Sequence, residues 1–156
     1  MKELDEYRVI CEFCEKSTEF KNSKQVTLKI DKRNSYQNLL ATIFEGAKQL
    51  YPRENILFLR GKKNKDVLQI KELVVPPFAV HGHGFATVPL YMMPVDFSIV
   101  GTVHSHPSGN MSLSNVDFNH FFGRIIMIVG FPFISKDNVA IYDSKGDALR
   151  LEITKE

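Results

Sequence analysis

Two histidines and one aspartate lie close together in the sequence and are the residues best suited to chemistry. His104 and His106 stand one residue apart at the end of the apolar segment FSIVGTVHSH, and Asp117 follows after a short loop. In a strand, side chains at alternate positions project from one face, so both imidazoles can reach a single ion. Two histidines and a carboxylate, with one position left for water, are typical of catalytic zinc sites. We therefore expect one zinc ion per chain, bound by His104, His106 and Asp117.

Ser114 and Asp117 also fit a purely structural pattern. A serine followed three residues later by an acidic residue can form a capping box, in which both side chains bond to amides at the start of a helix. A His-x-His triplet by itself likewise occurs on ordinary strand surfaces. The triplet, Ser114 and Asp117 rarely occur together at this spacing by chance, which favours a metal site. Taken alone, the pair Ser114 and Asp117 therefore favours helix capping, and only the joint pattern favours a metal site.

Composition limits the classes of function. With 156 residues, 44% of them hydrophobic and 24% charged, the chain has the composition of one globular domain. The net charge of +2 is too balanced for a nucleic-acid surface, so we expect no nucleic-acid partner. No apolar window could cross a membrane, and MKELDEYRV does not resemble a secretory signal, so we expect a cytoplasmic protein with no membrane contact. Cys11 and Cys14 are expected to be ordinary thiols, because a four-cysteine zinc site needs a second pair.

The elements that must position the candidate site follow from hydrophobic periodicity. Apolar residues at helical spacing predict a helix from a Ser35 cap to about Tyr51, where Pro52 ends it. A second helix should begin near Ser112 or Ser114. Short strands are predicted at residues 7–13, 25–30, 55–61, 66–75, 97–105, 124–130, 138–143 and 148–154. Strands outnumber helices in a mixed order, which predicts an α+β domain with a curved mixed sheet flanked by helices.

The segment HSHPSGNMSLSNVD, residues 104–117, resembles the signature of the JAMM (MPN+) zinc metalloproteases. These are isopeptidases and peptidases related to deubiquitinating enzymes. The resemblance covers about residues 35–156 and implies a catalytic domain there with the JAMM/MPN fold, which is cytidine deaminase-like. Residues 1–34 are then an N-terminal extension, predicted as a β-hairpin. The resemblance also implies that His104, His106 and Asp117 bind zinc and that Ser114 helps to stabilise the tetrahedral intermediate.

The same resemblance implies that Glu54 is the catalytic base. The family's glutamate lies on the strand after the first long helix, and YPRENILFLRG puts Glu54 at that place. A zinc-activated water needs a base that takes its proton and returns it to the leaving amine. Glu54 leads directly into an apolar strand, where burial could raise its pKa toward a useful value. Glu45, within the predicted helix, and Glu72, in an alternating strand where it faces water, are weaker candidates.

Residues 76–94, rich in glycine and proline, are predicted to form a long exposed loop. His81 and His83 form a second His-x-His there, but no carboxylate follows at a comparable distance, so a second metal site is not favoured. By resemblance, this loop borders the cleft and contacts the substrate. We predict substrate contacts from His83, Tyr91 and Met92, with the apolar end of the loop as an edge for an extended peptide.

The substrate is implied only by the resemblance. The short connection after the Asp117 helix leaves no room for the large insertion that grips a ubiquitin chain, so the chain resembles the compact prokaryotic or archaeal form. This implies a zinc metallopeptidase that cleaves after the C-terminal Gly-Gly of a ubiquitin-like modifier or sulfur-carrier protein. One alternative is an inactive MPN-type scaffold that binds partner proteins. Another is a zinc deaminase, but that class needs cysteine ligands that are missing near His104. The oligomeric state is open, and a homodimer is one option.

Overall fold

The computed structural model describes residues 5–11, 25–29, 39–64, 67–77, 79–93 and 95–155 of the chain. Eight strands form its main sheet: β1 (Asp5–Cys11), β2 (Gln25–Lys29), β3 (Ile56–Asn64), β4 (Val67–Val74), β7 (Ile99–His106), β8 (Ile125–Gly130), β9 (Val139–Asp143) and β10 (Ala148–Lys155). They pair in the order β1, β10, β9, β8, β7, β3, β4, β2, and the sheet closes because β2 also pairs with β1. The pairs β7–β8 and β2–β4 are parallel and the others are antiparallel, so the predicted mixed sheet is confirmed.

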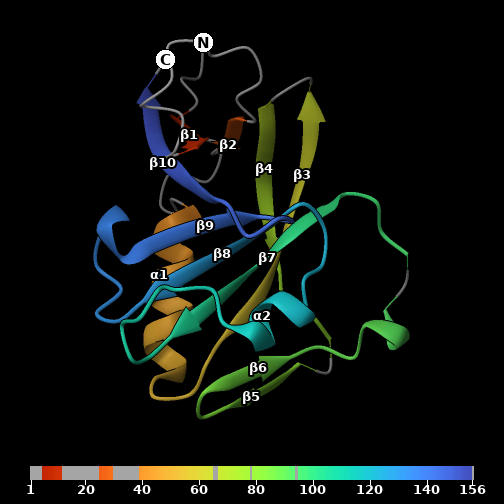
Figure 1. The fold of residues 1–156 in the computed structure, drawn as a ribbon, viewed down its shortest axis with the longest axis vertical. Helices are drawn as coiled ribbons and strands as arrows, with labels where there is room; N and C mark the ends of the chain where they lie inside the picture. The colour runs from red at the N-terminus through yellow and green to blue at the C-terminus, as the bar shows by residue number, and fades with distance from the viewer. Residues whose placement is uncertain are drawn as a thin grey trace.

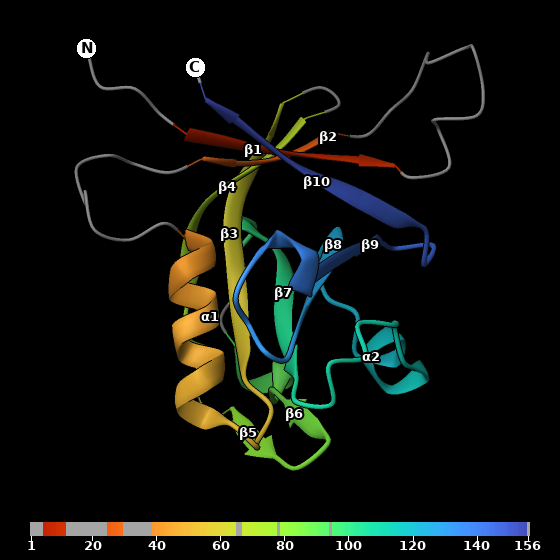
Figure 2. The same cartoon turned by 90° about the vertical axis from the view of Figure 1, so that its left-hand side faces the viewer.

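Two helices cover opposite faces of the central strands. Helix α1 (Leu39–Leu50) lies behind β8 and β9 in Figure 1, whereas α2 (Asn115–Asn119) lies in front of β7. Figure 2 shows β3 and β7 running between the two helices. This arrangement confirms the predicted α+β class. None of the helices in the described part of the chain is long and apolar enough to cross a membrane.

Helix α1 forms because its apolar residues recur at three- and four-residue spacing and can all face the sheet. Its buried residues are Leu40, Ile43, Phe44 and Ala47. They share one hydrophobic core with Leu59 of β3, Val103 of β7 and Met127 of β8. The helix ends at Leu50, just before Pro52, as predicted, while the predicted Ser35 cap lies outside the described residues.

The segment predicted as a long loop contains regular structure. Strands β5 (Val80–Gly82) and β6 (Phe85–Thr87) form a separate antiparallel hairpin, so the prediction of an irregular connection is wrong here. Gly84, with a φ of 79°, makes the tight turn possible because it has no side chain to oppose this conformation. A 3-10 turn, η2 (Leu90–Met92), replaces the extended edge predicted at the end of the loop. A second 3-10 turn, η3 (Lys136–Asn138), precedes β9.

Strands β1 and β2 belong to the main sheet. They pair antiparallel with each other; β1 also pairs with β10, and β2 pairs with β4. The connections at residues 12–24 and 30–38, with Cys14, lie outside the described residues. The division into an extension (1–34) and a catalytic domain (35–156) stays a prediction.

Candidate active site

Strand β7 carries both histidines and runs through the centre of the sheet. Residues 100–105 are buried, as expected for a strand covered on both faces. The strand pairs with β3, where Ile56 is opposite His104, and with β8, where Gly130 is opposite His106. These two ladders fix the direction of alternate side chains, so both imidazoles project into the same cleft.

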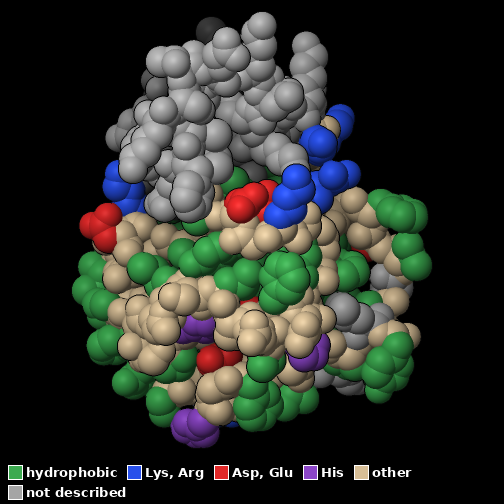
Figure 3. All heavy atoms as spheres, in the orientation of Figure 1, with side chains coloured by type: hydrophobic (Ala, Val, Ile, Leu, Met, Phe, Trp, Pro, Cys, Tyr) green, Lys and Arg blue, Asp and Glu red, His purple; other side chains and the backbone are tan. Residues whose placement is uncertain are grey.

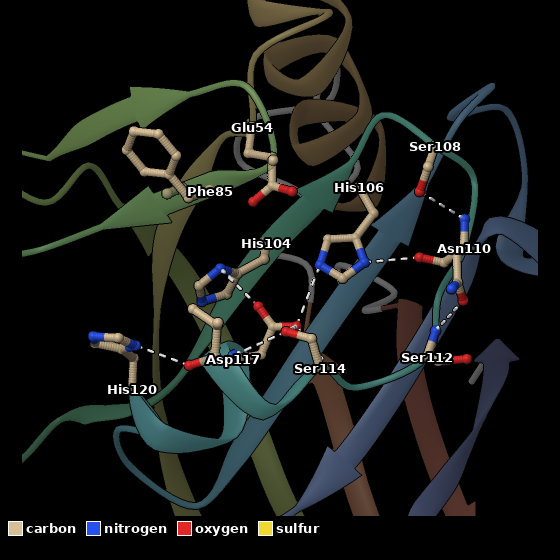
Figure 4. A pocket seen from close by; sticks show the side chains of 13 residues that line it. Glu54, Phe85, His104, His106, Ser108, Asn110, Ser112, Ser114, Asp117 and His120 are labelled. Carbon is tan, nitrogen blue, oxygen red and sulfur yellow. Dashed lines mark hydrogen bonds and ion pairs between the residues drawn. The ribbon is translucent and has the colours of Figure 1, made fainter.

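Histidine and acidic side chains gather below the centre of the face shown in Figure 3, on the side of the sheet that α2 covers. A cleft of about 280 Å³ lies between α2, the end of β7 and the β5–β6 hairpin. The predicted site residues that line it are Glu54, His104, His106, Ser114 and Asp117. Figure 4 shows that they come from three separate segments and face one another.

Asp117 reaches the cleft through the N-terminal cap of α2. Ser114 has an extended backbone (φ −82°, ψ 160°), and its Oγ accepts a hydrogen bond from the Asp117 N–H at 3.1 Å. In return, the Asp117 Oδ2 accepts from the Ser114 N–H at 3.0 Å and from the Ser114 hydroxyl at 2.5 Å. The capping box is therefore formed, and it directs the carboxylate toward the histidines.

His104 is the least satisfied polar side chain of the site. It is 2% exposed, and neither of its ring nitrogens has a hydrogen-bond partner among the residues that the structure describes. Burial lowers the pKa of His104 to about 4, although the nearby Asp117 carboxylate acts in the opposite direction. The imidazole is therefore neutral at neutral pH and has a lone pair available. Because buried polar atoms without partners are rare, these nitrogens point to a ligand.

His106 is oriented by a backbone acceptor. Its Nδ1 donates to the carbonyl oxygen of Asn110 at 2.7 Å, which leaves Nε2 facing Asp117. Burial acts to lower the pKa of His106, but the hydrogen bonds to Asp117 and to the Asn110 carbonyl outweigh it and raise this pKa. Burial opposes the ionised form of Asp117 as well, yet the hydrogen bonds from His106 and Ser114 hold its pKa far below the ordinary value. The Asp117 carboxylate is therefore anionic at neutral pH.

The distances between these side chains are slightly longer than those of a zinc site. Bonds of 2.0 to 2.2 Å in a tetrahedral site separate the ligand atoms by about 3.4 Å. The Asp117 Oδ2 lies 3.5 Å from His106 Nε2, and the Asp117 Oδ1 lies 3.9 Å from His104 Nδ1. Within the described ranges, no three His, Cys, Asp or Glu side chains lie close enough together to hold a metal ion in their present positions. Side-chain shifts of about half an ångström would bring the pairs to tetrahedral spacing.

Glu54 enters the cleft from the short segment between α1 and β3. Its neighbour Asn55 donates its N–H to the Ser105 Oγ at 2.7 Å and accepts from the Ser105 N–H at 3.0 Å. Ser105, between the two histidines, thus faces away from the cleft, and its hydrogen bonds to Asn55 hold the Glu54 segment against β7. Glu54 is 8% exposed. Burial raises its pKa, the negative charge of Asp117 adds to this effect, and His106 opposes it.

The three predicted substrate contacts do not line this cleft. His83 lies in the turn of the β5–β6 hairpin, and Tyr91 and Met92 lie in η2; all three are exposed. Residues 84–86 line the cleft in their place. Tyr91 and Met92 were predicted as part of a binding edge because they are apolar. The strand edge next to the cleft is instead β6, which at three residues is too short to show an alternating pattern.

Sequence reasoning also missed residues that act through backbone groups or through the helix surface. The Asn110 carbonyl, which orients His106, has no sequence signal because any residue supplies a carbonyl. His120 also lines the cleft, and its Nδ1 donates to the Val116 carbonyl at 2.8 Å. Its position three residues after Asp117 is the signal that could have found it, since residues at this spacing share a helix face.

Comparison with known proteins identifies the family. No family model matches the chain. A probable metalloprotease of Haloferax volcanii is 29% identical over 116 residues, which cover 70% of this chain and 71% of that protein. A JAB1/MPN domain protein of Archaeoglobus fulgidus is 32% identical in its solved structure, with a TM-score of 0.53, and the match covers 73% of this chain and 92% of the other. A structure described as JAMM, a metalloprotease-like zinc site in the proteasome and signalosome, is also 32% identical, with a TM-score of 0.53 and coverage of 74% and 91%. The chain therefore belongs to the JAB1/MPN domain family and is an enzyme of its JAMM metalloprotease type.

Proposed function

We propose that this enzyme uses one zinc ion, held by His104, His106 and Asp117, to hydrolyse a peptide or isopeptide bond. The bond follows the C-terminal Gly-Gly of a ubiquitin-like modifier or a sulfur-carrier protein. One observation carries the proposal: the buried carboxyl of Glu54, from a different segment of the chain, faces the two histidines and Asp117 across one cleft. Zinc bound there would polarise the scissile carbonyl and lower the pKa of a water to about 7.

Glu54 is the residue that moves the proton. Glu54 is not among the three proposed zinc ligands. Because its pKa is raised, the Glu54 carboxylate can take a proton from the water and hold it until it passes to the leaving amine. Asn55 and Ser105 fix the backbone next to it. The base is therefore placed by the same strand that places the histidines.

Ser114 combines two roles in this proposal. In the structure its hydroxyl donates to the Asp117 Oδ2 and so belongs to the helix cap. A rotation about its side chain would turn the O–H toward the cleft, where it could donate to the developing oxyanion. The capping and catalytic roles are then alternative positions of one hydroxyl.

Strand β6 supplies an edge for an extended substrate tail. In the described part of the chain, the main sheet is closed, while β6 pairs only with β5. Residues 84–86 at this strand line the cleft together with Glu54. Main-chain pairing along β6 would draw a flexible C-terminal tail into the cleft. A narrow cleft of about 280 Å³ favours glycines next to the cleaved bond, because they have no side chains to accommodate.

A linear fusion tests this function. The substrate is a ubiquitin-like domain that ends in Gly-Gly and continues into a reporter peptide, and it is incubated with zinc-loaded wild type and with Glu54→Gln. We expect wild type to cut after the second glycine and Glu54→Gln to be slower by about 10²- to 10⁴-fold in kcat, the usual contribution of a general base. Zinc content, measured by elemental analysis, should be equal in both proteins.

Glu45→Gln is the matched control, because Glu45 is an exposed glutamate on α1. It should retain the activity and zinc content of wild type. Full activity of Glu54→Gln would exclude Glu54 as the base. Stoichiometric zinc with no cleavage of several such fusions would exclude the substrate class, and a wild-type chain that binds no zinc would favour the inactive scaffold.

A further inference from the structure

We propose that His81 is a positioning residue for Glu54, joining the catalytic base to the β5–β6 hairpin. His81 lies in β5, and its Nδ1 is 3.0 Å from the carbonyl oxygen of Glu54. A carbonyl oxygen can only accept, so the proton of this hydrogen bond lies on Nδ1. The inference rests on the proposed role of Glu54 as the base.

Consecutive residues of β5 bind both polar backbone groups of Glu54. The Glu54 N–H donates to the carbonyl oxygen of Gly82 at 2.8 Å, and the Glu54 carbonyl accepts from His81. Glu54 precedes β3, which begins at Ile56, so the ladder of the main sheet does not include it. The hairpin therefore holds the backbone N–H and C=O of Glu54, while Ser105 holds the backbone N–H and C=O of Asn55.

The hydrogen bond from His81 also links the base to the substrate edge. In the β5–β6 register His81 is opposite Ala86, which is 7% exposed and lines the cleft. A displacement of the hairpin therefore moves the proposed substrate edge and the Glu54 backbone together. A misplacement of about 1 Å at a catalytic group can lower the rate by about 100-fold, so the expected effect is on kcat.

The test compares His81→Ala with His81→Asn in cleavage of the Gly-Gly fusion. The Asn side-chain nitrogen stands as many bonds from Cα as the histidine Nδ1 and can donate to the same carbonyl. We expect His81→Ala to lower kcat by roughly 10- to 100-fold with KM within about twofold of wild type, and His81→Asn to recover most of the lost kcat. Val80→Ala, which changes an exposed residue of the same strand that does not line the cleft, should behave as wild type.

A second measurement does not depend on activity. In the zinc-loaded protein, two-bond ¹H–¹⁵N spectra report which ring nitrogen of His81 carries the proton, and hydrogen exchange reports the protection of the Glu54 amide. We expect a proton on Nδ1, and faster exchange of the Glu54 amide in His81→Ala than in His81→Asn or Val80→Ala. Melting temperature and zinc content identify a variant that fails to fold.

The two proposals can fail separately. If wild type cleaves no fusion, the proposed substrate is wrong, yet the spectra and the amide exchange still decide the role of His81. A neutral His81 protonated only on Nε2 would overturn the positioning role. So would wild-type kcat in a folded His81→Ala, or a His81→Asn that is as slow as His81→Ala.

Discussion

Acid should destabilise the metal-free protein through His104. This side chain is 2% exposed, and burial lowers its pKa from 6.5 to about 4. The folded state therefore takes up the His104 proton less readily than the unfolded state does. The contribution of neutral His104 to the free energy of unfolding is fully present above pH 6.5 and is lost as the pH falls from 6.5 toward 4. The shift corresponds to roughly 3 kcal/mol, of which about 2 to 3 kcal/mol should be lost between pH 7.5 and 4.5.

The neighbouring titratable groups must be separated from this effect. Burial raises the pKa of Glu54, so Glu54 adds stability as the pH falls through its folded pKa. The pKa of His106 is raised, so its stabilisation is present below pH 6.5 and is lost as the pH rises through its folded pKa. The pKa of Asp117 is lowered, so its stabilisation is present above the unfolded value of 3.8 and is lost only at lower pH. None of these contributions weakens as the pH falls from 6.5 to 4.5. A loss of stability in that window that is specific to His104 can thus be isolated with a substitution.

The assay is urea unfolding of chelator-treated wild type and His104→Gln at pH 7.5, 6.5, 5.5 and 4.5. Glutamine keeps a polar side chain and does not titrate, so the free energy of unfolding of the variant should fall less by about 2 to 3 kcal/mol over this range. The contrast should be concentrated between pH 6.5 and 4.5. Parallel curves for the two proteins would refute the reasoning, because they would mean that His104 titrates alike in the folded and unfolded states.

Other substitutions test the cap, the core and the predicted substrate contacts. Ser114→Ala removes the cap and should lower the free energy of unfolding, measured in urea, by about 1 kcal/mol. It should also lower kcat by up to about 10²-fold. Ser114→Thr keeps a hydroxyl and should restore the stability. Leu59→Ala removes a side chain that is 0% exposed and should cost about 2 to 5 kcal/mol in the same assay. Tyr91→Ala should leave kcat and KM of fusion cleavage within about twofold of wild type, because Tyr91 is 89% exposed and outside the cleft; a tenfold rise in KM would restore it as a substrate contact.

The local parts of the site were predictable because their geometry depends on neighbours in sequence. Strand alternation gave the common direction of His104 and His106, and the serine-acid spacing gave the cap that the structure shows for Ser114 and Asp117. The amphipathic pattern likewise predicted the buried face of α1. In each case the direction of the side chains follows from the repeat of a strand or a helix, and that repeat can be seen directly in the sequence.

The long-range parts were not predictable from the residues alone. Glu54 is placed by hydrogen bonds of its own backbone with Gly82 and His81 and of its neighbour Asn55 with Ser105. Nothing in the order of residues states which of these distant segments will meet. Glu54 itself was found through family resemblance. The hairpin was missed because strands of three residues carry too little periodicity to be distinguished from a loop.

The reciprocal cap between Ser114 and Asp117 affects how the enzyme acquires its metal. Zinc fingers are unfolded until the ion binds, because the ion supplies their folding energy. Here hydrogen bonds within the chain already aim the carboxylate, and the closed sheet and its core hold both imidazoles. We expect the zinc ion to bind to and leave a protein that is already folded. Chelators should then remove the zinc without unfolding the protein. A change in zinc supply would switch the activity of existing enzyme molecules off or on without new protein synthesis.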